Sequence, residues 1–260
     1  MTQSFDDKGV HKKNIDFLGY TIETVDSVDS TNTELIRRMN AGSIGHGYVL
    51  LANEQTNGKG RRGRVWLSER GNLFFSIALD TKSSPEHLPQ LSFVSALTTH
   101  AVLSSLGLFP TLKWPNDLLL EGKKCCGILL EKSNFSSSSV VLGVGLNTKI
   151  TPSDNSKILY PATSIEEYLK EDTFSDNETL LRNWLEQFTK YYDIWDKDGF
   201  SPIRNEWLKY GHQLGEALHI ILPKGDIHGT FNDLDAEGNL LLKNEAGQIV
   251  CITAGDVFIV

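Results

Sequence analysis

Short apolar segments separated by polar turns run through the first 150 residues and predict strands. Many of their residues are aromatic or β-branched, and their lengths fit buried strands. The serine-rich residues 133–139 predict a hairpin turn between two of these strands, whereas residues 1–20 predict only an irregular lead-in. The predicted strands are residues 20–24, 48–53 (YVLLAN), 72–79 (NLFFSIAL), 112–120 (LKWPNDLLL), 125–132 (CCGILLEK) and 140–147 (VVLGVGLN).

Helical spacing of apolar residues occurs in three places. Thr31 and Glu34 form a capping box that predicts a helix start at residues 30–32, with Gly42 as its end. A second helix is predicted to end at Gly107, and a third to begin at a capping box of Ser175 and Glu178. The last helix carries an apolar stripe that we expect to be core, not a cofactor site. The defining positions are Leu91, Val94, Leu97, Ala101 and Val102, then Leu181, Trp184, Leu185, Phe188, Tyr192 and Trp195.

The pattern changes at about residue 212. From there, short apolar runs alternate with turn sequences such as PKGD (223–226) and DAEG (235–238). Closely spaced strands of this kind predict a small all-β module that is barrel-like. We therefore expect two domains, residues 1–211 and residues 212–260.

Composition and charge disfavour several classes of protein. The 260 residues carry a net charge of −8, with a pI near 5.4, which disfavours sequence-independent nucleic-acid binding because that requires a positive surface. No apolar run reaches the roughly 18 residues of a membrane span, and the N-terminus has no signal-peptide pattern. Cys125, Cys126 and Cys251 show no C-x-x-C spacing and fit reduced, free thiols. We expect a cytoplasmic protein that binds neither DNA nor a membrane.

The loop GKGRRGR at residues 58–64 is a basic exception within this acidic chain. Its glycines match G-x-G-x-x-G, but a dinucleotide site needs a helix after the motif, and here a strand is predicted to follow. The G-x-x-x-x-G-K-[ST] pattern of a phosphate-binding loop is absent from the sequence. A solvated basic loop fits poorly, because glycines let a backbone approach a ligand and arginines offer planar forks to carboxylate or phosphate. The loop predicts a clamp for an anion.

A second polar stretch is KWPNDLLLEGKK. Pro115 restricts the backbone, so Asn116 and Asp117 fall at a break between strands. Lys124 opens the next strand. A surface β-turn would explain these residues taken alone, but beside an anion clamp a binding site is the better interpretation.

Several segments together resemble the biotin–protein ligases, in the family's order and at similar spacing. The pairing of a basic glycine loop with KWPND is the specific part, and the resemblance is strong over about residues 25–150. The ATS at 162–164 and the small C-terminal module extend it. The segments are STN (30–32), QTNGKGRRGRVW (55–66), KWPNDL (113–118), KKCCGILLE (123–131) and GVGLN (143–147).

The resemblance implies an α+β protein, with a class II synthetase-like catalytic domain of mixed sheet and flanking helices, followed by an SH3-like β-barrel. It implies a two-step ligation. The carboxylate of biotin attacks the α-phosphorus of ATP to give biotinyl-5′-adenylate, and a lysine of a biotin carboxyl carrier protein then takes the biotin and releases AMP. Magnesium is expected with ATP, because cations must bring carboxylate and triphosphate together. No metal-ligating residue is singled out, and a monomer or weak homodimer is expected.

The resemblance also implies a biotin site. Short polar side chains at the predicted helix start are expected to contact the ureido ring. They can accept hydrogen bonds from its N–H groups and donate to its carbonyl. The glycine loop is expected to close over biotin and phosphate, held by Arg61 and Arg64. The residues expected around biotin are Ser30, Thr31, Asn32, Gln55, Gly58, Lys59, Gly60, Arg61, Lys124, Gly127, Gly143 and Gly145.

Three residues are implied to be catalytic. Lys124 is expected at the biotin carboxylate and the α-phosphate, with Arg61 beside it, and Asp117 is expected to help present the acceptor lysine as a neutral amine. Trp66 is placed near the adenine end, and Tyr160 is a candidate for stacking on adenine. The expected nucleotide-binding residues are Arg61, Arg62, Arg64, Trp66, Lys113, Asn116 and Asn147.

Two departures from the family pattern bear on these expectations. Lys59 stands where the family more often has arginine, which keeps the charge but loses bidentate geometry. The segment before STN is shorter than the helix-turn-helix domain that some members carry, so a ligase without a DNA-binding half is expected. Three alternatives stay open: a lipoate–protein ligase with the same adenylation chemistry, a biotin-sensing DNA-binding regulator, and a biotin-binding protein without turnover.

Overall fold

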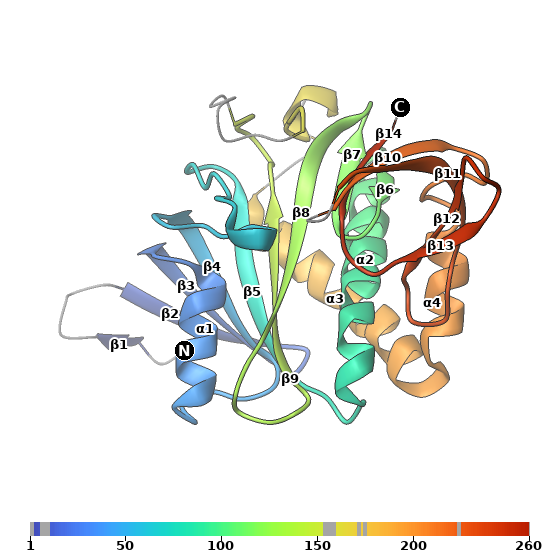
Figure 1. The fold of residues 1–260 in the computed structure, drawn as a ribbon. Coiled ribbons are helices and arrows are strands. Elements are labelled where there is room, and N and C mark those ends of the chain that lie inside the picture. The colour runs from blue at the N-terminus through green and yellow to red at the C-terminus, as the bar shows by residue number, and fades with distance from the viewer. Residues whose placement is uncertain are drawn as a thin grey trace.

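Two sheets organise the chain (Figure 1). The computed structural model describes residues 3–5, 11–152, 160–170, 173, 176–222 and 225–259. A mixed sheet has the strand order β1-β2-β3-β4-β5-β9-β8-β7-β6, with β3 and β4 parallel and its other neighbours antiparallel. Its strands are β1 (Gln3–Phe5), β2 (His11–Phe17), β3 (Tyr20–Val28), β4 (Tyr48–Gln55), β5 (Leu73–Asp80), β6 (Thr111–Lys113), β7 (Asp117–Leu120), β8 (Lys123–Lys132) and β9 (Ser139–Leu146).

Helices cover both faces of this mixed sheet, and a smaller sheet follows them. The smaller sheet is antiparallel, with the order β13-β12-β11-β10-β14, so the predicted α+β fold with a C-terminal β-module is confirmed. The helices are α1 (Thr31–Asn40), α2 (Leu91–Ser105), α3 (Asn177–Asp198) and α4 (Phe200–Trp207), with short 3₁₀ turns at Arg61–Gly63, Pro85–Gln90 and Glu166–Tyr168. The strands of the smaller sheet are β10 (Ala217–Ile221), β11 (Ile227–Leu234), β12 (Leu240–Asn244), β13 (Ile249–Ile252) and β14 (Asp256–Ile259).

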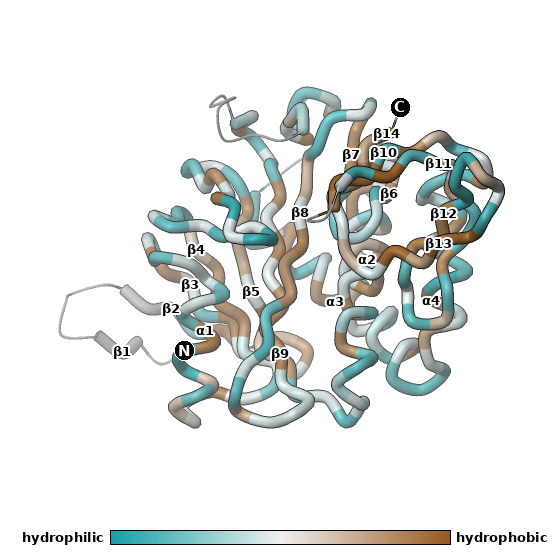
Figure 2. Tube along the Cα trace, viewed as in Figure 1, coloured by the Kyte–Doolittle hydropathy of each residue, from teal (hydrophilic) through white to brown (hydrophobic). Residues whose placement is uncertain are grey.

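Two apolar cores lie on opposite faces of the large sheet, because consecutive strand residues point to opposite sides. In β4, Leu50 packs with Leu35 and Met39 of α1, whereas its neighbour Leu51 joins the larger core on the other face. The larger core includes Trp184 of α3, so the aromatic stripe of that helix is core, as predicted. Figure 2 shows the apolar strands of the sheet between these helices.

Both predicted capping boxes are displaced by one residue. Ser30 is the N-cap of α1, and its hydroxyl accepts a hydrogen bond from the Thr33 N–H, so Thr31 is the first helical residue and not the cap. Ser175 lies outside the described residues, and Asp176 caps α3 by accepting from the Thr179 N–H. Both residues of a Ser-Thr or Ser-Asp pair are good caps, so the pattern alone did not choose between them.

The prediction of an irregular N-terminal lead-in is wrong, because β2 pairs antiparallel with β3 across a two-residue turn. The turn residues Leu18 and Gly19 both have positive φ, 51° and 83°. Tight hairpins usually place asparagine, aspartate or glycine at both positions, so leucine hid this one. The serine-rich segment 133–139 does join the antiparallel strands β8 and β9, as predicted. No helix in the described ranges is long and apolar enough to cross a bilayer.

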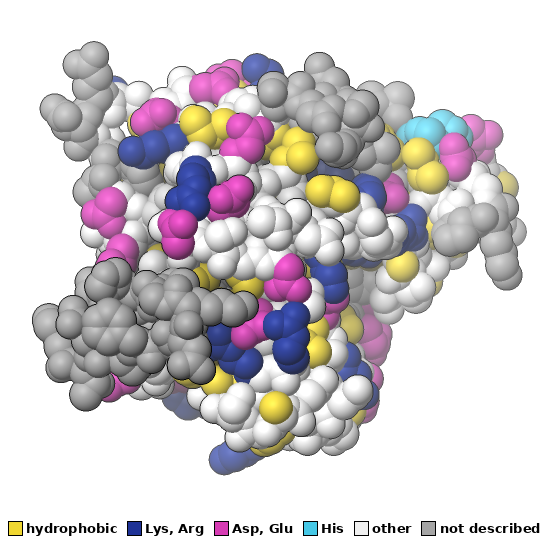
Figure 3. All heavy atoms as spheres, turned by 90° about the vertical axis from the view of Figure 1, so that its left-hand side faces the viewer, with side chains coloured by type: hydrophobic (Ala, Val, Ile, Leu, Met, Phe, Trp, Pro, Cys, Tyr) yellow, Lys and Arg dark blue, Asp and Glu magenta, His cyan; other side chains and the backbone are white. Residues whose placement is uncertain are grey.

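The small sheet is attached to the rest of the protein by polar and aromatic contacts. Trp114, at the turn between β6 and β7, donates its indole N–H to the Gly238 carbonyl (2.9 Å), and Arg204 of α4 donates to the Leu234 carbonyl (2.8 Å). These contacts hold the end of β11, and the turn that leads from it to β12, against the rest of the protein. Figure 3 shows the side that lies at the left of Figure 1, where basic and acidic side chains lie interspersed.

Candidate active site

One cleft of about 1240 Å³, including space open to solvent, collects the predicted site residues. It is lined by the start of α1, the glycine loop 58–64, strands β7 to β9 and residues 255–258 of the C-terminal sheet. All the predicted site residues line it except Gly58 and Arg62, which line an adjoining hollow.

The α1 end of the cleft is lined by hydroxyl and amide groups. Thr31 Oγ1 lies 3.0 Å from Gln55 Oε1 and 2.7 Å from Ser76 Oγ, which lies 2.6 Å from Asn32 Oδ1. Ser76, Thr31 and Asn32 are buried. Ser76 was not predicted as a site residue. A serine within an apolar strand does not indicate a binding site until the fold places it beside α1.

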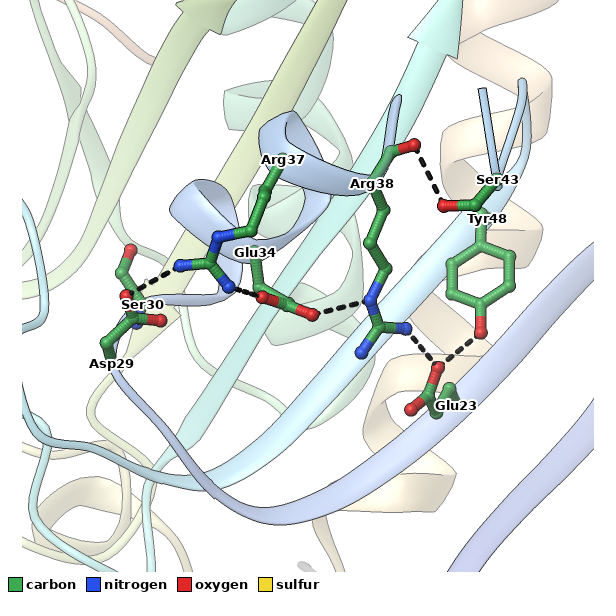
Figure 4. A network of polar contacts seen from close by, with 8 residues as sticks. All are labelled: Glu23, Asp29, Ser30, Glu34, Arg37, Arg38, Ser43 and Tyr48. Carbon is green, nitrogen blue, oxygen red and sulfur yellow. Dashed lines mark hydrogen bonds and ion pairs between the residues drawn. The ribbon is translucent and has the colours of Figure 1, made fainter. Parts of the chain in front are cut away.

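A polar network behind α1 holds its first residues in place (Figure 4). Buried Glu23 of β3 accepts hydrogen bonds from Arg38 of α1 (2.5 Å) and from the Tyr48 hydroxyl. Burial and the neighbouring Glu23 carboxylate raise the pKa of Tyr48, which keeps its hydroxyl a donor. At the other end of the helix, Asp29 accepts from the Ser30 N–H (2.8 Å). Ser30 is thus presented to the cleft by a fixed backbone.

Glycines form the floor of the cleft beside this polar end. Gly127 of β8 and Gly145 of β9 lie opposite each other in the sheet. A Cβ at Gly145 would lie 2.5 Å from the indole of Trp66, and one at Gly127 would lie 2.8 Å from it. The indole also has Lys124 Nζ at 5.3 Å from its ring centre. The structure therefore places Trp66 against the glycines that we predicted to lie under biotin.

Two lysines share one buried carboxylate at the centre of the cleft. Asp117 Oδ1 lies 2.5 Å from Lys124 Nζ, and Asp117 Oδ2 lies 3.2 Å from Lys113 Nζ. Burial raises the pKa of Asp117, but the charges of Lys124 and Lys113 outweigh it and hold the pKa below its ordinary 3.8. Burial lowers the pKa of Lys113, against the opposing charge of Asp117. This centre concentrates positive charge where an anion can replace solvent.

The glycine loop is tied down at both of its sides. Arg61 donates to Asn116 Oδ1 (3.1 Å), next to the lysine centre. Arg62 and Arg64 both pair with Asp256 of β14, at 3.1 Å and 2.5 Å. Burial lowers the pKa of Arg61, with the nearby carboxylate of Asp117 acting in the opposite sense. Asp256 was not predicted as a site residue, because its contact with the loop joins two ends of the chain.

Comparison with known proteins assigns this arrangement to a family. Profiles of the biotin/lipoate A/B protein ligase family and of the biotin protein ligase C-terminal domain match residues 24–147 and 214–260. A biotin–[acetyl-CoA-carboxylase] ligase of Paracoccus denitrificans is 34% identical over 88% of this chain and 97% of its own length. The chain belongs to the biotin protein ligase family.

Two further relatives of this biotin protein ligase family member are informative. The bifunctional ligase/repressor BirA of Bacillus subtilis is 32% identical over 77% of this chain and 63% of its own. The biotin protein ligase of Aquifex aeolicus, solved in complex with biotin and ATP, is 28% identical, with a TM-score of 0.77 over 91% of this chain and 97% of that one. The expected resemblance and the two-part fold are thus confirmed.

The close contact between Gly143 and Asn32 allows a first test in this family member. A Cβ at Gly143 would lie 2.2 Å from Asn32 Oδ1, and β9 is held between β5 and β8, so the strand cannot easily move away. Gly143→Ala should lower the free energy of unfolding by about 1–3 kcal/mol, as overpacking does, when measured by urea denaturation. Adding Asn32→Ala should restore most of that loss, and a fully stable single variant would contradict the contact.

Proposed function

We propose that the protein activates biotin with ATP and transfers it to a lysine of a biotin carboxyl carrier protein. The observation that carries the proposal is a single cleft with a hydroxyl- and amide-lined end and a cationic centre, which suit the ureido ring and the carboxylate of one ligand. Membership in the biotin protein ligase family supports it. So do the name of the Paracoccus relative and the biotin and ATP bound by the Aquifex protein.

Biotin would lie with its ureido ring at the start of α1 and its carboxylate at Lys124. The glycine floor gives space to the indole of Trp66, and the bicyclic ring would pack against that indole. We therefore propose Trp66 as a residue of the biotin end rather than the adenine end. Lys59, whose Nζ lies 4.0 Å from Glu131, would help to close the loop from the side of β8.

The nucleotide would occupy the other side of the cleft. Tyr160 lines it, with its ring 4.7 Å from Lys113 Nζ and 6.0 Å from the ring of Phe258, so its face is a candidate for stacking on adenine. Asn147 donates to the Thr163 carbonyl (3.0 Å), and its buried Oδ1 has no hydrogen-bond partner among the described residues. That oxygen would accept a hydrogen bond from a base amino group.

The first step forms a bond between a biotin carboxylate oxygen and the α-phosphorus and breaks the bond to pyrophosphate. Lys124 and Arg61 would neutralise the negative charges that otherwise keep the two reactants apart. In the second step the acceptor amine attacks the acyl carbon, loses a proton and displaces AMP. Both oxygens of Asp117 are already paired with lysines, whose charges also hold its pKa low, so we assign it to holding the two lysines.

Magnesium would arrive with the triphosphate. Asp117 is already paired with two lysines, and within the described ranges no group of three or more possible ligands could hold a metal. Magnesium is usually bound by few carboxylates together with phosphates and water, so this cleft fits a nucleotide-borne ion. Bound there, it would supply further positive charge at the phosphates.

The direct test is biotin-dependent exchange of labelled pyrophosphate into ATP, run in parallel with lipoate. We expect exchange with biotin and a much lower rate with lipoate, followed by avidin-detectable labelling of an apo carrier protein. Lipoate lacks ureido N–H groups and carbonyl, so it would leave the polar end of the cleft unpaired. Exchange driven by lipoate and not by biotin would reverse the assignment, and a DNA gel shift checks the regulator alternative.

A further inference from the structure

Three short contacts join four side chains at the α1 end of the cleft. Asn32 Oδ1 lies 2.6 Å from Ser76 Oγ, and Ser76 Oγ lies 2.7 Å from Thr31 Oγ1. Thr31 Oγ1 in turn lies 3.0 Å from Gln55 Oε1. Each contact needs one proton to be a hydrogen bond, but the two hydroxyls supply only two, because the amide oxygens at both ends only accept. One contact therefore lacks a proton.

Glu131 determines which atom of Asn32 faces this chain of contacts. The other end of the Asn32 amide lies 2.9 Å from Glu131 Oε2 and 3.4 Å from the Leu129 carbonyl oxygen. A carboxylate and a carbonyl only accept hydrogen bonds, so this end is the NH₂ group. The oxygen of Asn32 must then face Ser76, whose proton is committed to it.

At the opposite end of this chain of contacts, neighbouring groups determine the orientation of the Gln55 amide. The Thr31 N–H donates to Gln55 Oε1 (2.9 Å), and Gln55 Nε2 donates to Ser68 Oγ (2.9 Å), so the Gln55 oxygen faces Thr31. Thr31 Oγ1 donates to this oxygen at 3.0 Å, and Ser76 Oγ donates to Asn32 Oδ1 at 2.6 Å. The 2.7 Å contact between Ser76 Oγ and Thr31 Oγ1 is therefore the one without a proton.

Two adjacent acceptors without a proton between them favour a ligand that donates. We propose that Glu131, acting through Asn32 and Ser76, makes this end of the cleft selective for a ring N–H, and is a positioning and specificity-determining residue. The inference rests on the proposed function, since one ureido N–H of biotin would donate to the Thr31 hydroxyl oxygen, which lines the cleft. Glu131 lines the adjoining hollow and not the cleft itself, so it acts without touching the ligand.

The test compares biotin with the two cyclic carbamates in which one ureido N–H is replaced by a ring oxygen. In pyrophosphate exchange, the wild-type protein should prefer biotin over one carbamate by about 10- to 100-fold in kcat/KM, because that analogue leaves buried acceptors unpaired. In Glu131→Gln, the new amide can donate and Asn32 can turn over, so its NH₂ supplies the third proton. This preference should then fall by about tenfold and the KM for biotin should rise, with the KM for ATP unchanged.

A variant that moves the negative charge from position 131 to position 32 tests whether the direction of the hydrogen bonds, and not local packing, sets the selectivity. In the double variant Asn32→Asp with Glu131→Gln, the carboxylate at position 32 again only accepts, so Ser76 again donates to it and the preference for biotin should return. Adding Ser76→Ala to Glu131→Gln should also restore the preference, because no hydroxyl then remains to donate to Thr31. Ser95→Ala removes an equally buried hydroxyl from α2 and should leave the preference as in the wild type.

The outcomes distinguish this inference from the proposed function. Unchanged selectivity in Glu131→Gln, or KM values for biotin and ATP that rise together, would overturn the role of Glu131 while the wild-type protein still exchanges pyrophosphate with biotin. No return of the preference in either double variant would also overturn it. A wild-type protein without biotin-dependent exchange would instead reject the function on which the inference rests.

Discussion

Lys124→Ala should lower biotin-dependent pyrophosphate exchange by about 10²- to 10³-fold, the usual loss when one preorganised charge-stabilising group is removed. Lys124 Nζ lies in the cleft, 2.5 Å from Asp117 and above the ring of Trp66. It is the cation placed between the predicted biotin floor and the proposed phosphate position. Without it, a carboxylate and a triphosphate must approach each other with less positive charge between them.

The matched control is Lys123→Ala, the preceding residue of β8, whose side chain is exposed on the other face of the strand. It should exchange pyrophosphate at the wild-type rate. Urea denaturation of both variants shows whether Lys124→Ala stays folded at the assay temperature. A folded Lys124→Ala protein with wild-type exchange would remove Lys124 from the mechanism.

The sequence showed those parts of the site whose chemistry is unusual along the chain. Clustered arginines and glycines in the loop 58–64, and the Pro115-Asn116-Asp117 strand break, have few structural explanations, so they could be interpreted before folding. Ser76 and Glu131 could not, because a serine or glutamate in a strand is common. Their meaning depends on contacts with α1 that only the sheet order creates.

The same limit applies to the fold. Apolar segments predicted most strands of the large sheet, because a buried strand needs a run of apolar side chains and such a run is visible in the local sequence. The hairpin between β2 and β3 was missed because Leu18 adopts a backbone conformation that leucine seldom takes. The contact of Asp256 with Arg62 and Arg64 was missed because it joins segments 192 residues or more apart, and no local pattern records such a pairing.

The second large effect concerns stability. Asp117→Asn should lower the free energy of unfolding by about 3 kcal/mol at pH 7, because it leaves two partly or fully buried ammonium groups without their shared counter-charge. Lys113 is the more buried of the two, with 7% of its side chain exposed against 24% for Lys124. Denaturation curves of wild type and variant between pH 3 and pH 10 would measure the difference.

The control is Asp26→Asn, which removes a carboxylate bonded to Arg70 at 2.6 Å with 62% of its side chain exposed. Hydrogen bonds from Arg70 lower the pKa of Asp26 to about 2, yet exposed pairs contribute little to stability because water and salt screen them. Asp26→Asn should therefore unfold close to the wild-type midpoint. Equal losses of unfolding free energy in the two variants would mean that the burial of Asp117 with its two lysines does not contribute to the effect.

The loss of unfolding free energy in Asp117→Asn should become smaller at both low and high pH. The pKa of Asp117 is lower in the folded protein than its ordinary 3.8, so the ionised carboxylate stabilises the fold above that value and the contribution is lost as the pH falls through the folded pKa. The pKa of Lys113 is also lowered, and losing its carboxylate partner would lower it further. Raising the pH through that interval neutralises the unpaired lysine and relieves its cost. The deficit should thus be largest near neutral pH, and a pH-independent deficit would contradict an electrostatic origin.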